Sequence, residues 1–583
     1  MVPSNSKKKR PRSIVRRTSE RGAPSPRSPR VPGSPNKRES AREPWLPFLR
    51  GWRGTRLPVL IALTYAAIML PLALHYHRIG DYGVETDFYG GLVQESQQIA
   101  HGELLIGRFK GPVYGLALAA LSFPVGEFFT AAVILSVLSA ALALYFTAKT
   151  VLRLFGPTPA LLTVLGMAVN TQFVKYSYAA STDMLFNLWM IASAYFILRR
   201  EEPDRGGLFL AGLLAGLAYL TRYAGIALLC WAPLAILIIV GRRFSWRRRV
   251  FMTSLFLAGA LALIVPWAVY CKLRAGSFVV NDNYLNIAYN IYADKGANWD
   301  LFWGREAGNF HSLVDVVIRD PGLFVRKIAA NLLTHPFYDI GFNANDPGGT
   351  VKLPAAILSL MHPALGVLAL PGLVAWILSR PDRRQIAYFA LGASYFVILL
   401  AVFYGSRFSL FLVPAYVLLA VLFLLKVPWR HLGAIGGITR AVIVTGVFLF
   451  VAVDTGKVIR GDISSGPLVV LKMRDAVRAD RVPLIEGAIL VARKPHIAYY
   501  LKMEHRTFPN VETVPELMRE LRRMNARYLY YGPNEWLLRS QFRFLLDPRQ
   551  APQGLVPVVA FGSLSSKQPA VLYEIEPTSG PRR

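Results

Sequence analysis

Cysteine and charge are both scarce in this chain. Two cysteines, Cys230 and Cys271, occur among 583 residues, and both lie within or at the end of long apolar segments. The sequence therefore indicates neither a disulfide framework nor a cysteine-based metal site. Only 17% of the residues are charged, whereas 53% are apolar. This balance excludes an ordinary soluble protein of this length and predicts one that crosses a membrane many times.

Acidic residues are the scarcer charged class, with 35 Asp and Glu against 66 Lys and Arg. The net charge of +31 could suggest nucleic-acid binding, but its distribution argues against that class. Residues 1–56 form a Ser/Pro-rich basic segment that almost lacks aromatic stacking residues. Most other basic residues lie in short loops between apolar segments, which is typical of cytoplasmic loops. We expect no nucleic-acid partner and a disordered cytoplasmic tail at 1–56 that contacts anionic lipid.

The segment Pro112–Val125 decides the predicted topology. No cleavable signal peptide is apparent, so the first span, Leu57–Tyr76, enters from the cytoplasm and the residues after it lie outside. Pro112–Val125 has 14 residues, fewer than the roughly 20 that cross a bilayer. If it crossed, five later basic loops would all fall on the outer side. We therefore predict an interfacial or re-entrant helix at this position.

Eleven transmembrane spans follow from this assignment, with the N-terminus inside and the C-terminus outside. The predicted fold is a polytopic α-helical membrane domain at 57–455, with outer loops at 77–127 and 272–354. We place the protein in a plasma membrane, of the bacterial inner-membrane type. The spans are expected at about 57–76, 128–149, 157–176, 183–198, 207–221, 224–241, 250–271, 355–379, 385–404, 408–426 and 434–454.

Residues 456–583 have the pattern of a small soluble α/β domain on the outer face. Four strands are predicted, and the T-V-P-E sequence at Thr513 is a capping box that opens a helix. Alternation of strands and helices is typical of a layered α/β module. The strands are expected at 488–492, 528–531, 555–561 and 570–575.

The first outer loop gathers acids in a chain that is otherwise basic. Glu85 and Asp87 are two residues apart, so they would point in nearly opposite directions on a helix but share a face on an extended segment. Flanking glycines favour the extended form. Two converging carboxylates could act as a general base and an orienting partner. A solvated acidic loop is the structural alternative, and the pattern leaves open which of the two would be the base.

Cations at the outer border point to an anionic ligand. Lys175, Arg222 and Arg407 lie on the side where the charge rule disfavours basic residues, and Lys110 precedes the interfacial helix. A negatively charged group at the outer leaflet accounts for all of them. Taken singly, each has a structural explanation: lysine snorkelling, membrane-edge anchoring, or, for Asp183 at the start of a span, helix capping.

In this order, the motifs resemble those of the GT-C glycosyltransferases that use polyprenyl-phosphate sugars. The nearer branch comprises dolichyl-phosphate-mannose protein mannosyltransferases and lipid A aminoarabinose transferases. The resemblance covers about residues 57–425. Its motifs are E-T-D-F-Y, F-K-G-P-V-Y, S-T-D-M, G-L-L-A-G-L-A-Y-L-T-R-Y and G-S-R-F.

The resemblance implies roles for individual residues. Asp87 would lie near the acceptor nucleophile, with Glu85 as the other possible base and Asp183 as the second outer acid. The chain reads K-G-P where the family commonly has K-P-P, and E-T-D where a D-E pair is frequent. The residues implied to contact the donor are Lys110, Arg222, Arg407 and Tyr114.

The expected activity is transfer of a sugar from a polyprenyl-phosphate donor to a protein, lipid or glycan acceptor at the outer membrane face. A base deprotonates the acceptor, cations stabilise the departing phosphate, and direct displacement inverts the anomeric centre. No cofactor is expected, and a divalent metal is possible but not favoured. The alternative is a transporter or flippase of a lipid-linked substrate, although transporters usually place ionisable groups near the midplane. A membrane anchor for a binding domain would not need eleven spans.

Overall fold

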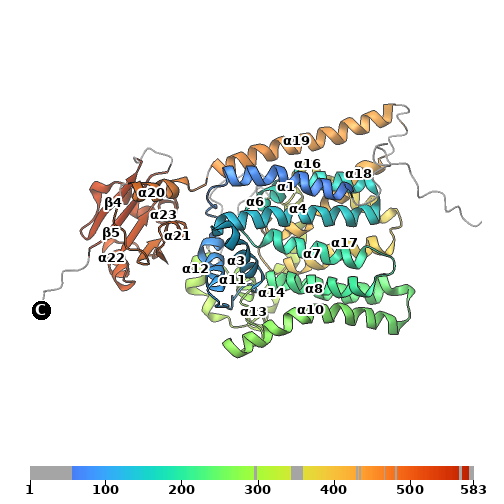
Figure 1. Ribbon diagram of the computed structural model, residues 1–583, viewed down its shortest axis with the longest axis horizontal. Helices are drawn as coiled ribbons and strands as arrows, with labels where there is room; N and C mark the ends of the chain where they lie inside the picture. Colours follow the sequence, from blue (N-terminus) through green and yellow to red (C-terminus); the bar gives the residue numbers. More distant parts are fainter. Residues whose placement is uncertain are drawn as a thin grey trace, which may run out of the picture.

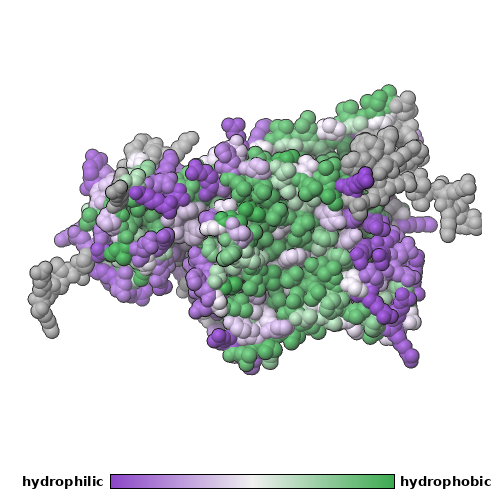
Figure 2. All heavy atoms as spheres, in the orientation of Figure 1, coloured by the Kyte–Doolittle hydropathy of each residue, from purple (hydrophilic) through white to green (hydrophobic). Residues whose placement is uncertain are grey.

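The computed structural model is a long helical body with an α/β unit at one end (Figure 1). It describes residues 56–293, 299–342, 359–427, 431, 435–464, 466–479, 482–562 and 568–576. The predicted basic tail thus lies outside the described residues, except for Arg56. Apolar side chains cover the visible flank of the helical body, whereas polar side chains gather at its far end and on the α/β unit (Figure 2). This is the surface expected of a body that is enclosed by lipid.

The longest helices run along the body (Figure 1). Five of the described helices are long and apolar enough to cross a membrane, and a sixth is obtained if the bent pair Thr171–Tyr178 and Asp183–Leu198 counts as one span. Along the body lie α1 (Arg56–Tyr76), α4 (Phe128–Phe155), α7 (Asp183–Leu198), α8 (Arg205–Thr221), α10 (Trp246–Ala275), α17 (Arg383–Leu399) and α19 (Gly436–Ser464).

The number of eleven spans is not confirmed, because several predicted spans are short or broken helices. The predicted span 157–176 is divided at Asn170, whose side chain accepts a bond from the backbone N–H of Phe173 and donates one to the carbonyl of Leu360. Hydropathy counts apolar residues but cannot detect such a break. The shorter elements of the body are α5 (Pro157–Ala168), α6 (Thr171–Tyr178), η3 (Tyr223–Gly225), α9 (Ile226–Leu234), η4 (Ala235–Ile239), η5 (Val240–Arg243), α16 (Pro363–Leu378), η8 (Phe408–Leu412) and α18 (Val413–Lys426).

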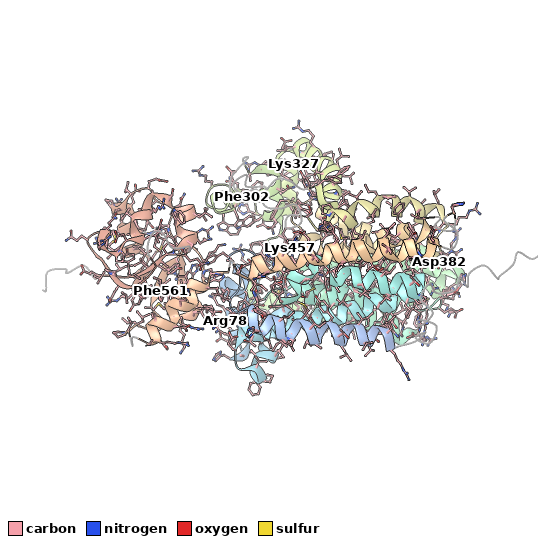
Figure 3. All side chains as sticks on the ribbon, turned by 90° about the horizontal axis from the view of Figure 1, so that it is seen from above. Arg78, Phe302, Lys327, Asp382, Lys457 and Phe561 are labelled. Atoms are coloured by element: carbon pink, nitrogen blue, oxygen red, sulfur yellow. The ribbon has the colours of Figure 1, made fainter. Side chains whose placement is uncertain are left out.

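The basic loops meet at the end of the body that is remote from the α/β unit. Glu201 pairs with Arg243 at 2.9 Å and with Arg384 at 3.9 Å, which joins three of these loops. Asp382 lies at this end in Figure 3, whereas Arg78 lies at the end facing the α/β unit. Arg78 follows α1, and Glu127, which precedes α4, lines the same cavity as Arg78. The helix predicted at Pro112–Val125, which lies between them in the sequence, therefore does not cross the body. This agrees with the prediction.

The two segments that the sequence predicts to lie outside, 77–127 and 272–354, are here named the first and second outer segments, and both are more helical than expected. In the first, η2 (Phe88–Leu92) leads into α2 (Val93–Ala100), and α3 (Val113–Val125) is the short helix predicted at Pro112–Val125. The second segment was predicted as a long loop, but most of its described part is helical, since short amphipathic stretches pack against one another around Phe302 and Phe310. Its elements are α11 (Tyr284–Tyr292), α12 (Trp299–Arg305), η6 (Ala307–Asn309), α13 (Leu313–Arg319), α14 (Pro321–Phe337) and η7 (Tyr338–Phe342).

The α/β unit contains a five-stranded mixed sheet in the order β2-β1-β3-β5-β4. Three strands coincide with the predicted ranges, and Thr513 forms the expected capping box with Glu516. β2 and α20 were not predicted; the sequence of β2, E-H-R-T, contains no apolar residue. One sheet face, with α20 and α21, packs toward the helical body, and the other packs against α22. The elements are α20 (Leu468–Ala479), β1 (Ile489–Ala492), α21 (His496–Tyr500), β2 (Glu504–Thr507), α22 (Val514–Arg523), β3 (Tyr528–Tyr531), α23 (Pro533–Leu538), η10 (Ser540–Leu546), η11 (Pro548–Gln550), β4 (Leu555–Phe561) and β5 (Ala570–Ile575).

Helices α8 and α10 approach each other through glycine. A Cβ atom on Gly259 would overlap the carbonyl oxygen of Phe209, and one on Gly212 would overlap that of Phe256. Small residues allow such close backbone contact between membrane helices.

We predict that Gly259→Val separates α8 from α10 and lowers the free energy of unfolding by roughly 1–3 kcal/mol. Thermal unfolding of the purified protein in detergent measures this change. Gly446→Val on α19 is the matched control, because no neighbouring atom lies within 4 Å of its Cβ position. Equal stability of the two variants would contradict the prediction.

Candidate active site

Glu85 is a buried structural centre of the first outer segment. Its side chain is 2% exposed. Oε1 lies 2.9 Å from Nε2 of His77 and accepts a 2.6 Å bond from the backbone N–H of Ala180, while Oε2 accepts from the N–H of Asp81. The carboxylate thus joins the end of α1 to the turn between α6 and α7. Both carboxylate oxygens are therefore engaged by protein groups.

Asp87 points elsewhere. Its backbone has φ −62° and ψ −29°, the right-handed helical region, and η2 starts at the next residue. The prediction that Glu85 and Asp87 converge on an extended loop is therefore wrong, because residues two apart on a helical turn project in nearly opposite directions. Glu85 is enclosed, whereas the Asp87 side chain is 51% exposed. Of these two acids, Asp87 is therefore the one that a substrate could contact.

Asp183 is the buried acid of the site. It begins α7 after a bend of 112° from α6, and its side chain is 4% exposed. Oδ1 accepts from Nη1 of Arg222, and Oδ2 accepts a 3.0 Å bond from Nε of Arg407. Asp183 therefore holds two arginines, which the helix-capping alternative does not account for.

Arg407 connects the two acids. Its Nη1 donates a 3.2 Å bond to Oδ2 of Asp87, while its Nε is held by Asp183. Arg222 reaches the cluster because α8 ends there: its backbone is extended, with φ −146° and ψ 130°. Its Nη1 also lies 3.3 Å from Oγ1 of Thr182. Residues from four separate parts of the sequence thus meet at one end of the body.

Lys110 adds a third cation, and it is half-buried. Burial would raise the pKa of Asp87, but the charges of Lys110 and Arg407 outweigh it and hold that pKa below its ordinary value. Burial also lowers the pKa of Lys110, although Asp87 opposes this effect. Asp87 is consequently an ionised carboxylate, beside cations, at neutral pH.

Gly111 explains the K-G-P sequence. A Cβ atom at Gly111 would overlap the carbonyl oxygen of Leu220 and lie 2.8 Å from its Cα. The chain can therefore pass against the last turn of α8, two residues before Arg222, only with glycine at this position. This contact brings Lys110 toward the arginine cluster.

Two residues singled out from the sequence form no hydrogen bond or ion pair with the acids and arginines of the cluster. Tyr114 is buried in α3, at 1% exposure, and its hydroxyl has no hydrogen-bond partner among the described residues. Lys175 pairs with Asp462 at 2.8 Å and with Asp81 at 3.3 Å. Lys175 thus fastens α19 to the first outer segment, which accounts for its charge without a ligand.

Two residues that support the site were not singled out from the sequence. Asn283 donates to the carbonyl of Phe109 at 2.9 Å, and the N–H of Asp282 donates to the carbonyl of Arg108 at 2.7 Å. They fix the backbone that leads to Lys110. The N-D-N sequence at 281–283 would by itself indicate only a turn, because the carbonyls that these residues bind lie more than 170 positions away.

Metal binding has no obvious donor set here. Within the part of the chain that the structure describes, no group of three or more His, Cys, Asp or Glu side chains is arranged to hold a metal ion. Asp87 and Asp183 are instead paired with arginine. The absence of a metal requirement stays a prediction.

We predict that Glu85→Gln lowers the free energy of unfolding by about 2 kcal/mol, because the amide NH2 leaves at least one buried N–H donor without an acceptor. Asp87→Asn is the matched control, since its side chain is half exposed and we expect little change in stability. Thermal unfolding in one detergent compares the two. A larger loss in Asp87→Asn than in Glu85→Gln would refute this assignment.

Comparison with known proteins agrees with the motif resemblance. Residues 110–270 match the family described as dolichyl-phosphate-mannose-protein mannosyltransferase. That segment includes Lys110, Asp183 and Arg222, but neither Asp87 nor Arg407. No curated protein is similar enough in sequence to this chain to count as a match.

Solved structures share the fold. ArnT from Cupriavidus metallidurans, bound to undecaprenyl phosphate, has a TM-score of 0.53 at 16% identity, covering 90% of this chain and 98% of ArnT. The oligosaccharyltransferase AglB from Archaeoglobus fulgidus, in complex with an inhibitory peptide and a dolichol-phosphate, has a TM-score of 0.50 at 12% identity, covering 82% and 70%. The chain is thus a multi-pass membrane protein with the GT-C glycosyltransferase fold. The suspected resemblance to the mannosyltransferase family is confirmed.

Proposed function

We propose that this protein is a membrane glycosyltransferase that moves a sugar from a polyprenyl-phosphate donor to a hydroxyl or amine acceptor. The observation that carries the proposal is the half-exposed Asp87 carboxylate, held by Arg407 beside Lys110, with Arg222 behind them. A base next to several cations suits a reaction that takes a proton from the acceptor and releases a phosphate. The acceptor class is a protein, lipid or glycan.

Each group has a part in the displacement. Asp87 accepts the proton of the acceptor O–H or N–H while the acceptor atom bonds to the anomeric carbon. The bond from that carbon to the phosphate oxygen breaks, and the electron pair leaves with the phosphate. Arg407 and Lys110 stabilise this developing charge, and well-aimed donors of this kind are worth roughly 3 kcal/mol each. Attack opposite the leaving group inverts the anomeric centre.

Asp183 is better suited to positioning than to proton transfer. Both of its oxygens are engaged by Arg222 and Arg407, and its side chain is 4% exposed. It would hold the two guanidinium groups in place for the phosphate, which arginine can grip through two parallel bonds. The proposal therefore makes Asp87, and not Glu85, the base.

The fold relatives support the choice of donor. The ArnT structure contains undecaprenyl phosphate and the AglB structure a dolichol-phosphate, both polyprenyl carriers. The convergence of the site charges at one end of the body favours an enzyme over a transporter, whose ionisable groups usually lie near the midplane. The basic loops at the opposite end would face the cytoplasm of a bacterial inner membrane. The α/β unit would then be extracytoplasmic.

We predict that Asp87→Asn lowers the rate of transfer by about 10²- to 10⁴-fold, the usual contribution of a positioned base, while the donor still binds. The measurement is transfer from a panel of polyprenyl-phosphate sugars to total membrane lipid and protein. Glu127→Gln, at the start of α4, is the matched acid-to-amide control. Full activity in Asp87→Asn would refute the base assignment, and loss of activity on chelation would refute metal independence.

We predict that Gly111→Ala reduces kcat/KM roughly 10- to 100-fold, because the added methyl group would displace Lys110 from the phosphate by a fraction of an ångström or more. Gly308→Ala is the control, since no neighbouring atom lies within 4 Å of its Cβ position. Unchanged kinetics in Gly111→Ala would show that the contact with Leu220 does not position Lys110.

A further inference from the structure

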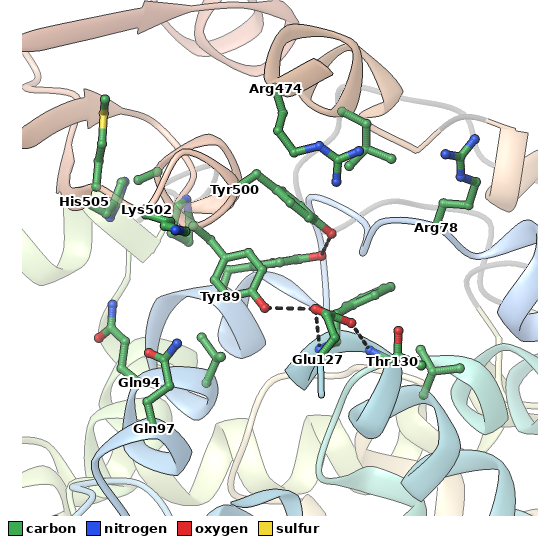
Figure 4. Close-up of a pocket in the computed structure, with 18 of the residues that line it drawn as sticks. Arg78, Tyr89, Gln94, Gln97, Glu127, Thr130, Arg474, Tyr500, Lys502 and His505 are labelled. Atoms are coloured by element: carbon green, nitrogen blue, oxygen red, sulfur yellow. Dashed lines mark hydrogen bonds between the residues drawn. The ribbon is translucent and has the colours of Figure 1, made fainter. Parts of the chain in front are cut away.

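A cavity of about 990 Å³ lies between the α/β unit and the end of the helical body (Figure 4). Its walls come from the residues after α1, from η2 and α2, from the start of α4, and from α20, α21 and β2. Tyr89, Gln94 and Gln97 of the first outer segment line it, whereas Asp87 does not. The cavity therefore lies on a different side of this segment from the proposed active site, and nothing in the proposed reaction uses it.

Four cations line the cavity: Arg78, Arg474, Arg478 and Lys502. Arg78 belongs to the helical body, and the others belong to the α/β unit. Arg78 and Arg478 are exposed and form no ion pair among the described residues, whereas Arg474 pairs with the exposed Asp475 at 2.6 Å and Lys502 pairs with Glu486 at the surface. Two basic side chains thus reach the cavity without a protein counter-charge.

Glu127 is the one acid in the lining, and its oxygens are already engaged. They accept bonds from the backbone N–H groups of Phe129 and Thr130 at the start of α4, and from the hydroxyl of Tyr499 at 3.0 Å. A carboxylate at a helix N-terminus is largely compensated by the helix dipole. The lining of the cavity consequently carries a net positive charge, which a bound anion would neutralise.

The remaining lining has an apolar part and a hydrogen-bonding part. Leu74 near the end of α1, Val133 of α4 and Leu471 of α20 supply the apolar part. The amides of Gln94 and Gln97 supply donors and acceptors, and in Figure 4 they rise from α2 while Arg474 reaches in from the α/β unit. Because α1 ends and α4 begins beside the cavity, it lies at the membrane border. A free anion would leave the apolar wall unused, whereas a lipid would cover it.

We propose that this cavity binds the phosphate-bearing headgroup of an anionic membrane lipid. The phosphate lies among Arg78, Arg474 and Arg478, the polar remainder of the headgroup meets the glutamines, and the acyl chains leave past Leu74 along α1. Since the ligand touches both parts of the protein, its binding also strengthens their contact. That contact already includes a 2.9 Å approach of Nε2 of His496 to the carbonyl of Asp81.

The test compares retained lipid in the full-length protein purified into nanodiscs of phosphatidylcholine with a varied fraction of phosphatidylglycerol. Native mass spectrometry counts the tightly bound anionic lipids. We expect the double variant Arg474→Gln, Arg478→Gln to bind phosphatidylglycerol at least about 5-fold more weakly than the wild type. Arg78→Gln, on the helical body, is expected to weaken binding in the same direction.

The matched control removes the same charge from the far face of the α/β unit. Arg519→Gln with Arg522→Gln changes two exposed arginines of α22, which packs on the sheet face turned away from the helical body. Equal lipid binding in the control and in the cavity variants would overturn the proposal, since general electrostatic attraction would then explain it. Unchanged binding in Arg78→Gln, with the fold intact, would also overturn it.

A second arm separates a lipid from a soluble anion. Glycerol phosphate carries the same charged group without acyl chains. We expect it to compete with phosphatidylglycerol at least about 100-fold less effectively than a soluble short-chain phosphatidylglycerol does, since the apolar wall contributes only to lipid. Equal competition by the two would assign the cavity to free phosphate esters and overturn the lipid proposal.

Discussion

The ion pairing of the buried Asp183 with Arg222 and Arg407 is the interaction on which the end of the helical body facing the α/β unit depends. A guanidinium group that is 19% exposed would be costly to bury without partners, and a buried Asp183 would be equally costly alone. Together with Arg222 they compensate one another and bring the bend before α7, the end of α8 and the start of η8 to one place. Only Asp87 keeps a side exposed to solvent, so the same network that stabilises the fold leaves one carboxylate available for chemistry.

The first outer segment then separates two polar sites. Glu85 fixes it from behind through His77 and the backbone of Ala180, and α3 holds it at the end of the body. Asp87 projects toward the arginines, while Tyr89 and the glutamines of α2 face the cationic cavity under the α/β unit. Asp87 and Tyr89 face different sites because residues two apart on a helical turn project in nearly opposite directions, whereas on an extended segment they would share one face.

Much of the architecture was predictable because apolar length and charge asymmetry are local properties of a membrane sequence. The short helix Val113–Val125, the strands β3, β4 and β5 and the capping box at Thr513 all follow from short-range patterns. The number of spans could not be predicted in this way. A break such as that at Asn170 depends on a hydrogen bond to the carbonyl of Leu360, nearly two hundred positions away. The conformation at Asp87 was also mistaken: the nearby glycines suggested an extended loop, but burial of Phe88 and Tyr89 against the α/β unit favours a helical turn.

The sequence by itself determined the membrane class, the end of the body at which the unusual charges lie, and a set of candidate residues that includes the four whose contacts join them there: Asp87, Asp183, Arg222 and Arg407. Hydropathy and charge act along the chain, so they can be read without knowing which helices touch. Only the tertiary structure decided which acid is exposed, which lysine is neutralised by a structural pair, and why glycine stands between Lys110 and Pro112. Those properties depend on contacts between distant segments, and their energies have no counterpart in local sequence.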